Sequence, residues 1–125
     1  MELSTSKEKG SRGEDLASDF LVSKGCIIKK RNWRFGRYEV DIIAECENTL
    51  IFAEIKYRTG KAFKDTFFVV TPKQRFNLIK AANYYIEVNS IQLESRFDIL
   101  EIVEVNGDKD IIHHINAFAP DVNQV

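Results

Sequence analysis

Apolar positions along this chain of 125 residues fall into two helical patterns and several short strand-like runs. Apolar residues recur at helical spacing over residues 12–24 and 72–88, which predicts two helices. Runs rich in Ile, Val, Phe and Tyr predict five strands, at residues 26–33, 38–44, 50–58, 96–105 and 110–119. The pattern predicts one domain over residues 1–125, in the order α-β-β-β-α-β-β, with residues 1–9 and 120–125 frayed.

Local signals set the ends of these elements. The S-x-x-E sequence from Ser11 to Glu14 has the form of a capping box, which would begin the first helix and place Glu14 in its first turn. Thr71-Pro72 predicts the N-cap and first position of the second helix. Asn106-Gly107 is a strong turn signal and predicts that the last two strands form a hairpin.

Charged residues interrupt the second and third strands, whose apolar runs are typical of strands covered on both faces. Side chains alternate along a strand, so Glu39 and Asp41 would share one face of the second strand. Glu54 and Lys56 would likewise share one face of the third strand, so three carboxylates and one ammonium can converge. A carboxylate removed from water is costly unless it is paired or binds a metal. Two interpretations follow: an ion cluster in which Lys56 pairs with Glu54 or Asp41, or a metal site.

Basic residues flank these two strands. The net charge of −1 argues against a general nucleic-acid binder, yet residues 24–37 hold six basic residues and no acid. Residues 56–80 hold seven more against a single acid. Either these are solvated lysines and arginines, or they form a phosphate-binding rim around an acidic centre. Seven residues are the candidates for that rim: Arg34, Arg37, Arg58, Lys61, Lys64, Lys73 and Gln74.

Cys26 and Cys46 lie in or beside apolar segments without metal-finger spacing, and we expect buried free thiols. The adjacent pair His113-His114 would point one ring to each face of a strand, which is a poor metal site. Trp33 and Phe35, interleaved with arginines, could stack on bases, although packing at the edge of the core is the favoured interpretation.

No apolar run reaches the ~20 residues of a membrane span, and the first residues lack the apolar centre of a signal peptide. We therefore expect a cytoplasmic protein without a membrane partner.

The element order, an acid in the second strand and E-x-K in the third resemble the core of the restriction-endonuclease-like, PD-(D/E)xK nucleases. Asp41 and Glu54-Ile55-Lys56 match that motif, with Val40 in place of its frequent proline. The resemblance implies an α/β fold with a central mixed five-stranded sheet flanked by helices.

A closer resemblance, to the YraN family of small bacterial endonuclease-like proteins, extends over nearly the whole chain. The segments that carry it are Gly13-Glu14-Asp15-Leu16-Ala17, Arg31-Asn32-Trp33-Arg34, Glu39-Val40-Asp41-Ile42-Ile43, Phe52-Ala53-Glu54-Ile55-Lys56-Tyr57-Arg58 and Arg96-Phe97-Asp98. The order Glu, Asp, E-x-K is also similar to archaeal Holliday junction resolvases, in which a glutamate near the start of the first helix joins the metal site.

The resemblance implies metal-assisted hydrolysis of phosphodiester bonds in structured or branched DNA. Asp41, Glu54 and the main-chain carbonyl of Ile55 would bind Mg²⁺ or Mn²⁺, with Glu14 and Glu39 as additional candidates. Lys56 would orient the attacking water and stabilise charge on the phosphate.

Two other functions remain open at this point. One is a nucleic-acid-binding module with a nuclease-like fold and no efficient catalysis, and the other is a structural domain whose strand charges form an ion network. A homodimer that presents two sites to two strands is one arrangement that the nuclease function would allow.

Overall fold

The computed structural model describes the backbone of residues 6–59 and 70–119, and their side chains from Arg12 onward. It contains two helices and five strands: α1 (Ser6–Ser23), β1 (Ile27–Phe35), β2 (Tyr38–Cys46), β3 (Thr49–Thr59), α2 (Pro72–Val88), β4 (Glu94–Val105) and β5 (Asp108–Phe118). The strands form one sheet in the order β1-β2-β3-β4-β5, in which β3 and β4 are parallel and the other neighbours antiparallel. The predicted mixed five-stranded sheet and the α-β-β-β-α-β-β order are confirmed, and both are consistent with a nuclease-like α/β fold.

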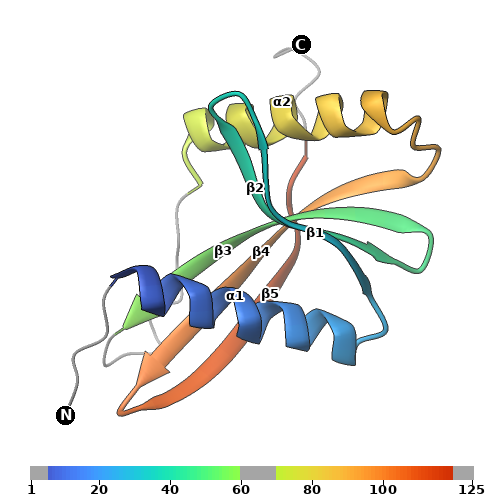
Figure 1. Ribbon diagram of the computed structural model, residues 1–125. Helices are drawn as coiled ribbons and strands as arrows, with labels where there is room; N and C mark the ends of the chain where they lie inside the picture. Colours follow the sequence, from blue (N-terminus) through green and yellow to red (C-terminus); the bar gives the residue numbers. More distant parts are fainter. Residues whose placement is uncertain (1–5, 60–69, 120–125) are drawn as a thin grey trace.

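The two helices cover opposite faces of the sheet, as Figure 1 shows. Leu78, Ala82 and Tyr85 of α2 pack with Phe52 and Phe97 on one face. Ala17 and Leu21 of α1 pack with Ile51, Ala53 and Leu100 on the other. The apolar runs of β2 and β3 are thus covered on both sides, which explains why they lack polar alternation.

The hairpin turns follow from residues that accept a left-handed backbone. Glu47 and Asn48 between β2 and β3 have φ of 47° and 63°. Asn106 and Gly107 between β4 and β5 have φ of 52° and 85°. Two central residues with positive φ are typical of the type I′ turn that matches the twist of antiparallel strands.

The predicted start of the first helix is wrong. α1 begins at Ser6, six residues before the predicted start at Arg12, so Ser11 lies inside the helix and not at its N-cap position. Residues 6–9, which we expected to be frayed, form its first turn, whereas residues 1–5 and 120–125 lie outside the described part of the chain. Glu14 is consequently near the middle of α1, where the field of the helix terminus has little effect.

The end of α1 is a Schellman motif centred on a glycine. The N–H of Gly25 donates to Val22 O at 2.9 Å, and the N–H of Cys26 donates to Leu21 O at 3.0 Å. Gly25 has a φ of +91°, which an L side chain would strain. The motif turns the chain directly into β1.

The expectation of free thiols is also wrong, because Cys26 and Cys46 form a disulfide with a Cα–Cα distance of 4.4 Å. The register of the first hairpin accounts for it. Ile27 pairs with Glu45, so the next residues outward, Cys26 and Cys46, lie opposite each other. The cysteines are 20 residues apart in sequence, and only the hairpin register reveals their proximity.

Among the described helices, neither is long and apolar enough to cross a membrane.

Candidate functional site

Asp41 and Ile55 make the contact around which the candidate site is built. Regular pairing of β2 with β3 ends at Ile42 and Ala53. Just beyond this last pair, the Ile55 N–H donates a hydrogen bond of 2.9 Å to Oδ2 of Asp41. A side-chain carboxylate therefore takes the place of a main-chain acceptor where the two strands stop pairing, and Asp41 is fixed against the E-x-K segment.

Glu54 and Lys56 flank Ile55 and form an ion pair, with 3.6 Å between Lys56 Nζ and Glu54 Oε1. Both are only partly exposed, with 22% of the Glu54 side chain and 26% of the Lys56 side chain accessible. The other carboxylate oxygen, Glu54 Oε2, is buried and has no hydrogen-bond partner among the described residues. A buried carboxylate oxygen in this state is costly unless a cation or donor occupies its remaining lone pairs.

The pKa of the Asp41 carboxyl also favours a cation at this position. Removal from water raises the pKa of the Asp41 carboxyl, and the hydrogen bond from Ile55 lowers it in part. The negative charges of three other carboxylates raise it further, to about 6 from an ordinary 3.8: Glu54, Glu39 and Glu14. Four carboxylates from α1, β2 and β3 thus share one electrostatic neighbourhood.

α1 brings Glu14 toward this neighbourhood through a close approach at Gly13. A Cβ at Gly13 would lie 3.1 Å from Ile102 Cδ1 and 3.3 Å from Tyr57 Cδ2, so the glycine lets the helix lie against β3 and β4. Glu14 Oε2 accepts a 2.8 Å hydrogen bond from Asn32 Nδ2 and lies 3.4 Å from Arg31 Nη2. Glu14 is therefore tied to β1 as well as being near Asp41.

Glu39, an additional candidate for the metal site, has a basic partner. Its Oε2 lies 3.5 Å from Arg34 Nη2, directly across the β1–β2 ladder. Both side chains are substantially exposed, at 37% for Glu39 and 74% for Arg34, so this ion pair adds little stability.

Among the described residues, no three Asp, Glu, His or Cys side chains converge closely enough to hold a metal by themselves. A divalent ion at this site would be held by the carboxylates of Asp41 and Glu54, the carbonyl of Ile55 and water. Mg²⁺ prefers such a site, since it binds few protein oxygens and retains several waters. The unpartnered Oε2 of Glu54 and the raised pKa of Asp41 both fit a site completed by a cation.

The described residues among those predicted to bind nucleic acid lie on several different elements. Arg34 and Arg37 are exposed near the turn between β1 and β2, and Lys73 is exposed in the first turn of α2. Arg58 lies on β3 beyond Lys56, with its Nε 3.4 Å from Oε2 of the buried Glu101. Lys61 and Lys64 lie outside the described residues.

Gln74 is part of the cap of α2. The Gln74 N–H donates to Oγ1 of Thr71 at 3.1 Å, and the Thr71 N–H donates to Oε1 of Gln74 at 3.0 Å. This reciprocal capping box confirms the predicted helix start at Thr71-Pro72 and gives the Gln74 side chain a structural role.

Trp33 and Phe35 pack against α2, which agrees with the favoured interpretation that they belong to the edge of the core. The ring of Phe35 stacks on Tyr84 with 3.7 Å between centroids and 6° between planes. Trp33 meets Tyr85 edge to face at 5.3 Å.

Two buried acids on β4 are polar centres that sequence reasoning missed. Asp98 is fully buried and accepts two 2.8 Å hydrogen bonds from Arg96, one of 2.7 Å involving His113 Nε2 and one of 2.9 Å from the Asn116 N–H. Burial alone would raise the pKa of Asp98, but the hydrogen bonds from His113 and Arg96 outweigh it and hold the pKa below its ordinary value. The sequence signal was the Arg96-Phe97-Asp98 segment, in which the arginine and the aspartate share one face.

The second of these acids is Glu101, which is 1% exposed. It contacts Arg58, as described above, and its Oε1 lies 3.3 Å from His114 Nε2. His113 and His114 thus each contact a buried carboxylate, on opposite faces of the sheet, which agrees with the prediction that they do not share a site.

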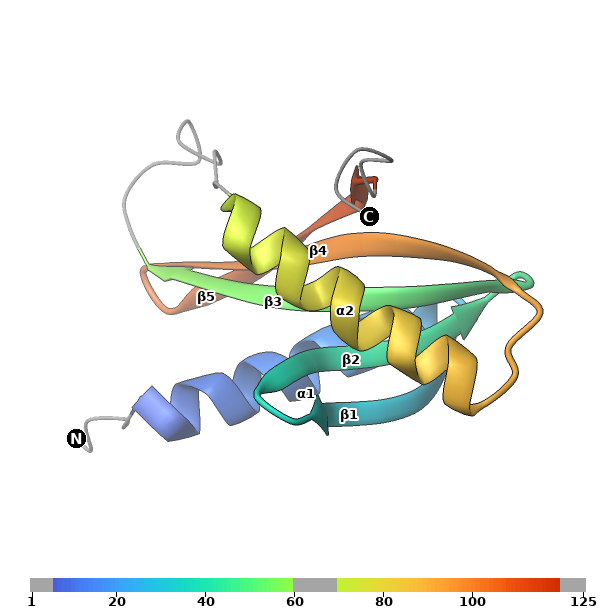
Figure 2. The same cartoon turned by 90° about the horizontal axis from the view of Figure 1, so that it is seen from above.

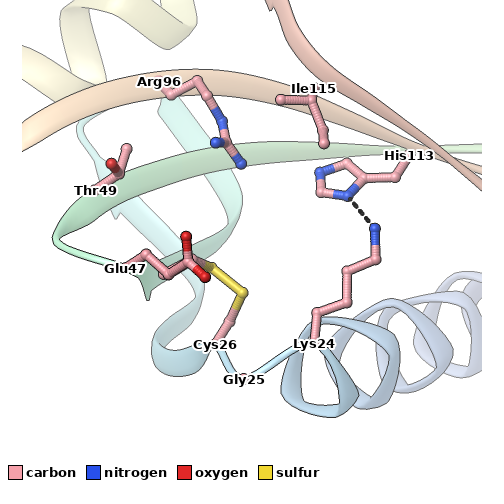
Figure 3. Close-up of a pocket in the computed structure, with 9 residues that line it drawn as sticks. Lys24, Gly25, Cys26, Glu47, Thr49, Arg96, His113 and Ile115 are labelled. Carbon is pink, nitrogen blue, oxygen red and sulfur yellow. Dashed lines mark hydrogen bonds between the residues drawn. A yellow bond between two sulfur atoms is a disulfide. The ribbon is translucent and has the colours of Figure 1, made fainter.

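A pocket of about 320 Å³ lies away from the candidate site, where α1 ends and β3 begins. Figure 3 shows the Cys26–Cys46 disulfide, Arg96, Lys24 and His113 around it, with Lys24 Nζ 3.3 Å from His113 Nδ1. None of the predicted metal or catalytic residues lines it. The candidate chemistry lies instead near the point where β2 and β3 part.

The sequence of this fold matches one family model. The Uncharacterised protein family UPF0102 matches residues 13–102, a range that holds Glu14, Asp41, Glu54 and Lys56. The chain belongs to the UPF0102 (YraN) family. The predicted resemblance to the YraN family is therefore confirmed.

UPF0102 relatives are similar over most of their length. A UPF0102 protein of Christiangramia forsetii is 41% identical over 111 residues, covering 89% of this chain and 93% of the relative. One of Clostridioides difficile is 40% identical over 113 residues, covering 90% and 97%. One of Bacteroides thetaiotaomicron is 35% identical over 113 residues, covering 90% and 93%. Family membership does not establish a function, which has to be argued from the site.

Proposed function

We propose that this UPF0102 member is a cytoplasmic, metal-dependent endonuclease that hydrolyses phosphodiester bonds in structured or branched DNA. One observation carries the proposal: two carboxylates that are removed from water lie near each other. Glu54 has a buried oxygen without a hydrogen-bond partner among the described residues, and the hydrogen bond from Ile55 holds Asp41 against the same segment. A buried carboxylate oxygen without a hydrogen-bond partner is costly, and a bound cation would compensate it. Lys56, in contact with Glu54, adds the cation that this class of hydrolysis uses.

Each residue has a role that follows from its contacts. Asp41 and Glu54 would hold Mg²⁺ or Mn²⁺, which when bound activates a water and polarises the phosphate. Lys56 is held close to Glu54 and remains partly exposed, so its ammonium can orient the attacking water and stabilise the negative charge that develops on the phosphate. Glu14, anchored by Asn32, is near enough to influence Asp41 and could hold a water in the same site.

A branched substrate presents strands of different direction to the protein. One chain carries one such set of residues among those described, so paired cuts in a junction would be made by a homodimer. This arrangement is part of the proposal.

The proposal is tested by incubating labelled four-way junction, flap, duplex and single-stranded DNA with the protein in Mg²⁺ and in Mn²⁺. Glu54→Gln removes a proposed metal ligand at nearly constant volume. Glu87→Gln, an exposed position near the end of α2, is the matched control. We expect cleavage by the wild type and by Glu87→Gln, and none by Glu54→Gln.

Failure to cut any of these substrates would contradict the nuclease proposal. Binding without cleavage would favour the alternative, a nucleic-acid-binding module that has the same fold but no efficient catalysis.

A further inference from the structure

The Cys26–Cys46 disulfide forms part of the wall of the pocket where α1 ends and β3 begins. Figure 3 shows the disulfide together with the other side chains around this space. Cys26 is 8% exposed, whereas Cys46 is only partly buried, so Cys46 is the more accessible of the two residues. The pocket volume of about 320 Å³ is at the lower end of the range for ligand sites, which suits a small molecule.

Two exposed side chains of opposite charge line the same pocket. Lys24 directly follows α1, and Glu47 belongs to the turn between β2 and β3. Figure 3 shows Glu47 on one side of the disulfide and Lys24 on the other. A small molecule that carries both a carboxylate and an ammonium group would therefore meet a complementary charge at each side of the disulfide.

The ammonium of Lys24 is held at the pocket by its contacts. Its Nζ lies 3.3 Å from His113 Nδ1 and 4.6 Å from the centre of the Phe20 ring. An ammonium only donates, so His113 Nδ1 accepts and His113 Nε2 carries the proton that is donated to Asp98 at 2.7 Å. Asp98 also balances the charge of Arg96, which lines the pocket. Lys24 is consequently the cation that a ligand would meet.

We propose that this pocket is a site of thiol–disulfide exchange with a low-molecular-weight thiol that carries a carboxylate and an ammonium group, as amino-acid thiols do. The thiolate of the ligand attacks Sγ of Cys46, the bond to Cys26 breaks, and Cys26 leaves as a thiolate that takes a proton from water. A second thiolate attacks the ligand sulfur of the mixed disulfide and releases Cys46. Two thiols are thereby oxidised to one disulfide, and the protein disulfide is reduced to two thiols.

The surroundings of the disulfide favour this exchange. A lysine beside a cysteine stabilises the thiolate, so Lys24 would assist the departure of the Cys26 sulfur as well as attract the carboxylate of the ligand. The cytoplasmic location proposed above agrees with this role, because disulfides that form there usually take part in redox reactions. The exchange does not depend on the nuclease proposal, since the metal and catalytic candidates lie outside the pocket.

The test is the rate at which three small thiols reduce the disulfide of the oxidised protein, followed by mass spectrometry after alkylation. Thioglycolate is anionic, cysteamine is cationic, and the neutral β-mercaptoethanol provides the reference rate for each variant. Lys24→Gln should lower the relative rate with thioglycolate by about threefold at low ionic strength, and Glu47→Gln should do the same for cysteamine. Both effects should disappear in about 1 M salt, where charges are screened within about 3 Å.

Lys73→Gln and Asp108→Asn are the matched controls, because each removes one exposed charge far from the pocket. Figure 2 shows that α2, whose first turn holds Lys73, begins at the end of the sheet where β3 finishes. Asp108 lies at that same end, in the turn that follows β4. Neither control should change the relative rate with either charged thiol.

The exchange site is wrong if Lys24→Gln and Glu47→Gln show the same relative rates as the wild type. It is also wrong if the reduction rate rises with urea in proportion to the unfolded fraction, since the thiols would then reach the disulfide only after unfolding. Charge-specific changes in protein that cuts no DNA would uphold the exchange site while the nuclease proposal fails.

Discussion

The N–H of Ile55 donates a 2.9 Å hydrogen bond to Oδ2 of Asp41, and this one contact joins the acid of β2 to the E-x-K segment of β3. It forms where regular pairing of the two strands ends. This hydrogen bond fixes the Asp41 carboxylate near the Ile55 carbonyl and Glu54. The first prediction concerns what this arrangement binds.

A divalent metal should stabilise the wild type and stabilise Asp41→Asn less. A ligand that binds only the folded state at 100 times its Kd adds about 2.7 kcal/mol to the free energy of unfolding. The measurement is the melting temperature in Mg²⁺ or Mn²⁺ against EDTA, with the exposed Asp108→Asn as control. An equal rise in the wild type and in Asp41→Asn would remove Asp41 from the metal site.

Without metal, stability should depend on pH through Asp41. Its pKa in the folded protein is about 6 against an ordinary 3.8, so the folded state binds this proton more tightly than the unfolded state does. The resulting stability is present in full below about pH 4 and is lost as the pH rises through 6, a change of about 3 kcal/mol. Urea unfolding in EDTA should show the wild type losing stability relative to Asp41→Asn over this interval; a constant difference would disprove the raised pKa.

Reduction of the Cys26–Cys46 disulfide should destabilise the protein. In the chain-entropy description, closing a loop of about this length stabilises the folded state by about 3 kcal/mol. Urea unfolding with and without reductant measures the loss, and the double variant Cys26→Ser/Cys46→Ser should be insensitive to reductant. If the oxidised and reduced wild type unfold at the same urea concentration, the disulfide contributes nothing to stability.

Asp98→Asn should be strongly destabilising, because it removes the negative charge that Arg96 requires in a buried site. Breaking a buried ion pair on one side costs about 3–5 kcal/mol. Asp108→Asn, an exposed substitution of the same kind, should change the free energy of unfolding by less than about 0.5 kcal/mol. If Asp98→Asn and Asp108→Asn unfold at the same midpoint, the contacts of Asp98 do not stabilise the folded protein.

Much of the fold could be predicted because its signals are local. Thr71-Pro72 fixed the start of α2, Asn106-Gly107 fixed the last hairpin, and the apolar runs of β2 and β3 indicated a sheet interior. The start of α1 could not be predicted in the same way. Its first residues are polar and show little helical periodicity, so the S-x-x-E sequence was mistaken for a cap.

The candidate site was predictable in part for the same reason. Asp41, Glu54 and Lys56 stand in two adjacent strands, where alternation and a single hairpin suffice to bring them together. Contacts between segments that are far apart in sequence could not be predicted from strand alternation and local turn signals. Cys26 with Cys46 depends on the register of a long hairpin, and Glu101 with Arg58 depends on a parallel pairing across an intervening helix.

The most direct test of the central claim is the rate of DNA cleavage as a function of Mn²⁺ concentration, in the wild type and in Asp41→Asn. We predict that the wild-type rate rises with Mn²⁺ and saturates, and that Asp41→Asn either does not cleave or needs at least about tenfold more metal, since even outer-shell partners change metal affinity by that factor. Cleavage by Asp41→Asn with the wild-type rate and metal dependence would contradict the claim that Asp41 holds a catalytic metal.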